Sequence, residues 1–176
     1  MKGEGMIRKW KLWLIALVVV LVAGGSFAYT SMTGSSTVTI TGGGTEFSTV
    51  TAAGFTWTTY PTGGQIGSVQ AGNLYTVARD GDYTGNLVFT VALINADELI
   101  NKYVYLNLQI RVMDGAATPD EVTTEWLTLE EGVVELVVPA AKTGPFTVKI
   151  NDGTYRTEPG VDPTSAPSFN IRVRQR

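Results

Sequence analysis

Carboxylates, hydroxyls, lysine, arginine and tyrosine are the side chains that could do chemistry in this chain, because its 176 residues include no cysteine and no histidine. That composition excludes zinc sites built from Cys or His, the usual haem ligands, the Ser-His-Asp and Cys-His nucleophile systems, and disulfides. No nucleophile, base and orienting group can be assembled from the residues that remain. We therefore expect neither an enzyme nor a cofactor.

Two acidic pairs are the candidates for a site. Asp80 and Asp82 flank Gly81, a spacing found in calcium loops, but the other ligand positions of such a loop are missing and an acidic turn is the alternative. Glu130 and Glu131 are adjacent, and adjacent side chains of a strand point to opposite faces, so they form a poor acid and base pair for glycoside hydrolysis. We expect turns at both places and assign no metal ligand.

Four aromatic residues suggest a further site. Trp57, Tyr60, Tyr75 and Tyr83 could form a platform for a sugar, which would make the protein a carbohydrate-binding or adhesion module. The alternative is that these rings alternate into a β-sheet core, as aromatic residues commonly do.

The N-terminal segment has the composition of a secretory leader. Four basic residues precede an uninterrupted apolar run from Leu12 to Ala23, and small residues follow at Ser26 and Ala28. This pattern predicts a signal peptide over residues 1–28, cut between Ala28 and Tyr29. The alternatives are an uncleaved membrane anchor and a type IV pilin-like leader that ends at Gly5 and leaves a hydrophobic helix. All three export the chain, to the extracellular space or the cell surface.

The net charge differs between the leader and the part of the chain that follows it. Four of the 13 basic residues and one of the 16 acidic residues precede Tyr29, so the remainder carries a net charge of −6. An acidic domain with 44% apolar and 16% charged residues does not suit nucleic acid, and we expect no such partner.

From Ser35 onward the sequence alternates between apolar and polar residues in short runs separated by turns, which predicts antiparallel strands. We expect the two central core strands at Leu87–Ile94 and Tyr103–Met113, a helical turn between them at Asn95–Asn101, and a tight turn at Asn151–Gly153. Further strands are expected at Thr37–Thr41, Phe47–Thr51, Phe55–Tyr60, Leu74–Val77, Thr123–Leu129, Val133–Val138, Phe146–Ile150, Thr154–Thr157 and Phe169–Arg174. This pattern predicts one all-β domain over residues 45–176, an antiparallel β-sandwich of jelly-roll or immunoglobulin-like type, behind an N-terminal strand and glycine hinge at residues 29–44.

A sequence resemblance adds to this picture. The leader passes through Gly24-Gly25-Ser26-Phe27-Ala28-Tyr29-Thr30 directly into a β-prone segment. Gly81-Asp82 then precedes the strand Asn86–Ile94, which is followed by Asn95-Ala96-Asp97-Glu98-Leu99 and the strand Lys102–Ile110. In the leader, the mature N-terminus and residues 80–112, the chain resembles the camelysin/TasA-like family of secreted fibre subunits.

The resemblance implies a jelly-roll-like subunit of an extracellular filament, pilus or biofilm-matrix fibre, in which the N-terminal strand of one copy completes the sheet of the next. The donor positions would be Tyr29, Met32, Val38 and Ile40, within residues 29–41. The glycines of residues 42–44 (Gly42, Gly43 and Gly44) would be a hinge that lets the strand pair in cis or in trans. The alternative is that Thr37–Thr41 is simply the first strand of its own sandwich.

A basic strand end offers a second contact between copies. Arg172, Arg174 and Arg176 share one face of the last strand, and they could meet an acidic patch such as Glu130 and Glu131 on a neighbouring subunit. The alternative is a charged edge that prevents aggregation. We thus expect a homopolymer that meets the membrane only through an uncleaved leader, and the main alternative is a cell-surface module that binds carbohydrate.

Overall fold

The structure, a computed structural model, describes residues 32–35, 38–40, 47–59, 64–115, 120–161 and 166–176. The chain divides into two units, residues 1–30 and 31–176, and the first lies outside the described residues. The leader with its cleavage site, the hinge at residues 42–44 and Tyr60 also lie outside them. Among the residues that are described, no helix is long and apolar enough to cross a membrane.

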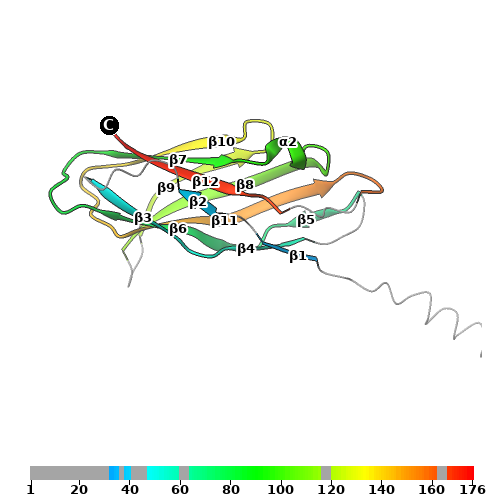
Figure 1. The fold of residues 1–176 in the computed structure, drawn as a ribbon, viewed down its shortest axis with the longest axis horizontal. Coiled ribbons are helices and arrows are strands. Elements are labelled where there is room, and N and C mark those ends of the chain that lie inside the picture. Colours follow the sequence, from blue (N-terminus) through cyan, green and yellow to red (C-terminus); the bar gives the residue numbers. More distant parts are fainter. Residues whose placement is uncertain (1–31, 36–37, 41–46, 60–63, 116–119, 162–165) are drawn as a thin grey trace, which may run out of the picture. The chain divides into compact units, whose positions relative to one another are not determined.

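Twelve strands and one helical turn make up the described chain (Figure 1). The strands are β1 (Met32–Ser35), β2 (Val38–Ile40), β3 (Ser48–Ala52), β4 (Thr56–Thr59), β5 (Ile66–Ser68), β6 (Gly72–Arg79), β7 (Leu87–Leu93), β8 (Tyr103–Asp114), β9 (Asp120–Thr128), β10 (Val133–Val138), β11 (Phe146–Thr157) and β12 (Phe169–Gln175), and the helical turn is α2 (Ala96–Leu99).

These strands form two large sheets and one small one. The first has four strands in the order β10-β7-β12-β2, and the second has six, in the order β3-β6-β11-β8-β9 with β5 also paired to β11. A separate two-stranded sheet joins β1 to β4. The expected all-β sandwich is therefore confirmed, and every described pairing is antiparallel except that of β2 with β12.

The core lies between the two large sheets and follows directly from the alternation in the sequence. On β8, Leu106, Leu108, Ile110 and Val112 are fully buried, while the residues between them are half-buried on the outer face. Across the core, the rings of Phe89 on β7 and Phe146 on β11 meet edge to face at 5.8 Å. Full burial of a large apolar side chain stabilises the fold by about 1.5–3 kcal/mol. As expected, β7 and β8 are each flanked by strands on both sides.

One expected turn is wrong. Asn151–Gly153 does not reverse the chain, because β11 runs through it from Phe146 to Thr157 and stays paired with β8 on both sides. The register shifts between Ile150 and Asp152, so the polar residues form a β-bulge instead of a hairpin. The Gly153 backbone also lies so close to β8 that an added Cβ would be 2.7 Å from the carbonyl oxygen of Asn107.

The helical turn after β7 is confirmed, and the residue before it ties two distant segments together. Asn95 precedes α2 but makes no side-chain capping bond. Its amide nitrogen donates to the carbonyl oxygen of Ala166 at 3.0 Å, and its amide oxygen accepts from the backbone N–H of Ser168 at 2.9 Å. This residue therefore fixes the chain just before β12 begins.

Candidate functional site

The predicted donor strand reaches the four-stranded sheet at β12, whose outer side is the edge that β2 covers. On one side, β12 pairs with β7 over seven residues, from Phe169 to Gln175. On its other side, the pairing that the described residues make is with β2, and it covers only Phe169–Ile171. Phe169, Ile171 and Val173 point into the core, whereas Arg172 and Arg174 are exposed.

Two of the predicted donor residues reach this edge within their own chain. The parallel register places Val38 opposite Phe169 and Ile40 opposite Ile171. Met32 does not join them, because it lies on β1 and pairs with Thr59 of β4. The N-terminal segment is thus two short strands in two different sheets, and the β2 pairing is the cis arrangement.

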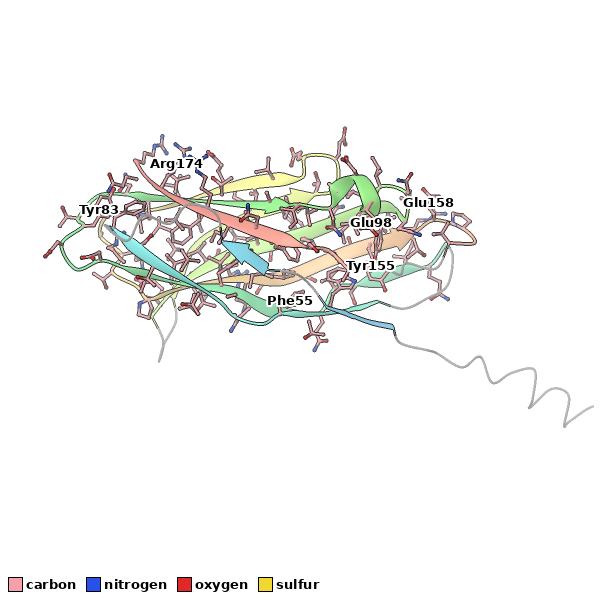
Figure 2. The ribbon with its side chains drawn as sticks, viewed as in Figure 1. Phe55, Tyr83, Glu98, Tyr155, Glu158 and Arg174 are labelled. Atoms are coloured by element: carbon pink, nitrogen blue, oxygen red, sulfur yellow. The ribbon has the colours of Figure 1, made fainter. Side chains whose placement is uncertain are left out.

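A cluster of aromatic rings lies where these short strands attach. The ring of Phe55 is 6.3 Å from that of Phe169 on β12 and 6.4 Å from that of Trp57 on β4. Trp57 is in turn 6.4 Å from Tyr155, which lies 5.8 Å from Tyr103. Figure 2 labels Phe55 and Tyr155 at this place. Trp57 is 1% exposed, so it anchors β4 in the core, and β4 in turn offers its backbone to β1.

Two polar atoms are buried within this aromatic cluster. The indole nitrogen of Trp57 and the hydroxyl of Tyr103 are buried, and neither has a hydrogen-bond partner among the described residues. Burial raises the pKa of Tyr103 to about 12, and the neighbouring Trp57 N–H acts in the opposite direction. Burial also raises the pKa of Tyr75 above its usual range. Both phenols therefore stay neutral at physiological pH.

Of the four platform candidates, the three that the structure describes form no exposed platform and instead lie in or against the core, the alternative that the sequence offered. Trp57 and Tyr75 are buried in the core, and Tyr83 is half-buried with its ring beneath the guanidinium of Arg79, 5.7 Å away. Among the described aromatic residues, Trp126 on β9 has an exposed ring, at 48%. Strand alternation could have identified Trp126 as outward, because it lies next to Leu127, which is fully buried.

The basic strand end is as exposed as predicted, but one of its arginines already has a partner. Arg174 donates from Nη2 to both carboxylate oxygens of Glu135, at 3.0 and 3.1 Å, within the same sheet. Glu135 was missed as a partner, although it is the one charged residue in the alternating strand β10. Arg172 and Arg176 form no ion pair with any residue that the structure describes.

The acidic pairs lie in turns, as expected. The backbone N–H of Asp82 donates to Oδ1 of Asp80 at 3.1 Å, which closes the turn after β6. No group of three or more acidic side chains within the described ranges could hold a metal ion. Glu130 and Glu131 lie in the turn between β9 and β10, where they line a groove together with Asp97.

Comparison with known proteins adds no identification, since neither a family model nor a curated protein matches the chain.

Proposed function

We propose that this protein is an exported structural subunit of an extracellular filament, such as a pilus or a biofilm-matrix fibre. Subunits join head to tail when the N-terminal strand of one copy pairs with β12 of the next. The observation that carries this proposal is the short parallel pairing of β2 with an edge that is more than twice as long. The resemblance of the leader and residues 80–112 to the camelysin/TasA-like family points in the same direction.

The energetics favour a longer strand in trans over the short one in cis. A backbone hydrogen bond contributes about 1 kcal/mol net, so the three-residue pairing of β2 contributes about 3 kcal/mol. A donor strand that pairs along all seven residues of β12 gains four further residues, or about 4 kcal/mol. That difference corresponds to a factor of roughly 1,000 in the equilibrium constant, which offsets part of the entropy lost on association.

Release of the cis strand leaves the body with most of its contacts. The β1–β4 pairing covers four residues in a sheet of its own, and an isolated two-stranded sheet is marginal in water. The buried side chains of β4, β7, β8, β11 and β12 belong to one core. A filament of this kind also suits a chain without disulfides, because intersubunit pairing adds stability that a lone domain lacks.

Head-to-tail donation has a geometric consequence. The donor segment and the β12 edge are different surfaces, so the contact is heterologous and produces an open filament instead of a closed pair. The same contact repeats at every subunit, and the length of the filament depends on how many subunits are available.

The test is deletion of residues 29–41 followed by addition of that segment as a peptide. The deleted protein should remain folded, stay monomeric in sedimentation and form no filaments in electron microscopy. The peptide should bind it, whereas a peptide carrying Val38→Asp and Ile40→Asp should not. Filaments that form without residues 29–41 would overturn strand donation.

A further inference from the structure

A groove with apolar walls lies at one end of the sandwich. It has a volume of about 390 Å³ and is formed by α2, the start of β8 and the turn between β9 and β10. Two apolar residues on its wall, Ile100 and Val104, are 60% and 47% exposed. Val133, directly after the lining residue Gly132, is 45% exposed. Exposed apolar side chains that gather in this way mark contact surfaces for another molecule.

The charge around this groove is negative and uncompensated. Asp97, Glu130 and Glu131 line it, and no basic residue does. None of these three carboxylates forms an ion pair with a described residue, although Glu131 accepts a hydrogen bond from the hydroxyl of Thr128 at 3.3 Å. A partner that fits must therefore carry positive charge next to apolar side chains.

The same chain carries such a surface on the outer face of its four-stranded sheet. Arg172 and Arg176 are exposed there and form no ion pair among the described residues, while Arg174 is bonded to Glu135. Val137, 36% exposed, lies in the same cross-strand row as Arg174, because both pair with Val88 of β7. The exposed apolar side chain thus lies beside Arg174, and the unpaired Arg172 and Arg176 lie two residues before and after Arg174 along the chain.

The two surfaces lie apart on the sandwich, because the C-terminal half of β12 runs away from the Leu93 end of β7, where α2 follows. Figure 1 shows α2 toward one end and the C-terminus toward the other, and Figure 2 labels Glu98 of α2 and Arg174 in these places. We propose that the groove of one subunit binds the basic C-terminal half of β12, with Arg172 and Arg176, of a second copy. This inference rests on the proposed filament and deepens it, because it gives each subunit junction a second contact that sets register.

Charge reversal on the full exported chain tests the contact. The variant Glu130→Lys/Glu131→Lys and the variant Arg172→Glu/Arg176→Glu should each raise the critical concentration for filament formation, followed by light scattering, on the order of 100-fold. An equimolar mixture should recover assembly to within about tenfold of wild type, because each variant's groove then meets a complementary strand on the other.

A matched control separates specific contact from net charge. Asp82→Lys/Glu125→Lys changes the net charge by the same amount at exposed positions outside the groove that form no ion pair with a described residue, and it should assemble like the wild type. Thermal unfolding of each variant verifies that the body is folded. The inference is overturned if folded groove variants assemble normally, or if the mixture stays as defective as its components.

The outcome also separates this contact from strand donation. If deletion of residues 29–41 abolishes filaments but charge reversal does not affect them, the groove contact fails alone. If the two charge variants bind each other in sedimentation while the deleted chain still polymerises, the groove contact holds and strand donation fails. Because both charge variants keep the donor strand, the groove contact is measured as a difference: the mixture of the two variants must associate more tightly in sedimentation than either variant does alone, and equal association overturns the contact.

Discussion

Locking β2 onto β12 in cis should stop assembly. The register pairs Thr39 with Asn170, and adjacent strands lie about 4.8 Å apart, within the range that a disulfide spans. Since the chain has no cysteine, Thr39→Cys/Asn170→Cys creates a single defined bond. A loop on the order of 130 residues is then closed, and the chain-entropy relation gives up to about 5 kcal/mol of added stability against unfolding.

The assay compares oxidised and reduced protein. Oxidised monomer should melt at a higher temperature than reduced monomer and form no filaments, and reductant should restore assembly, because the lock holds the donor strand in its own chain. Protein that is polymerised first and oxidised afterwards should instead give a ladder of covalent multimers on a non-reducing gel.

A control disulfide joins two strands of the body that are not expected to exchange. Thr49→Cys/Ala78→Cys joins β3 to β6 at a register pair of exposed residues, and it should stabilise the body while leaving assembly intact. If oxidised Thr39→Cys/Asn170→Cys protein, locked within each monomer, polymerises as readily as its reduced form, β2 does not exchange and the reasoning is refuted.

Three further predictions concern the body. Burial raises the pKa of Tyr103 from 10.0 to about 12 on folding. The contribution of its neutral phenol to the free energy of unfolding is therefore complete below pH 10 and is lost between pH 10 and 12, by about 1.4 kcal/mol per pH unit. Tyr103→Phe should flatten that slope in alkaline denaturation. Gly153→Ala should destabilise by about 1–3 kcal/mol in urea unfolding, since a backbone oxygen blocks its Cβ, whereas Gly81→Ala, with open space, should be nearly neutral. Phe89→Ala should cost about 3–5 kcal/mol in the same assay, and a loss below 1 kcal/mol would contradict its place in the core.

Local alternation explains why most of the fold was predictable. Side chains on successive residues of a strand face opposite sides, so the buried and exposed positions of β8, β10 and β12 can be read from the residues themselves. The turn at Glu130 and Glu131 was predictable from the glycine after them, because Gly132 adopts a positive φ of 66° that favours glycine, but the strands that it joins lie in different sheets and do not form the hairpin that the sequence suggests.

What the sequence did not reveal depends on distant partners. Asn151–Gly153 has the composition of a turn, yet its conformation is decided by the ladder that β8 supplies. Strand β5, Ile66–Ser68, has only three residues, one of them a glycine, so its sequence shows no strand pattern. It forms because β11 extends past β6 and pairs with it. The burial of Trp57 was predicted only as an alternative to a sugar-binding platform, because an aromatic side chain suits both a core and a binding face.

In the proposed filament, the position of β12 in the chain bears on when a subunit can join others. This strand follows every other described strand in the chain, yet it lies inside the four-stranded sheet, between β7 and β2. A nascent chain therefore carries a finished donor segment long before it has an edge that could accept one. In the proposed filament, a chain that stops before β12 could therefore donate its strand to the end of a filament but could not accept the next one.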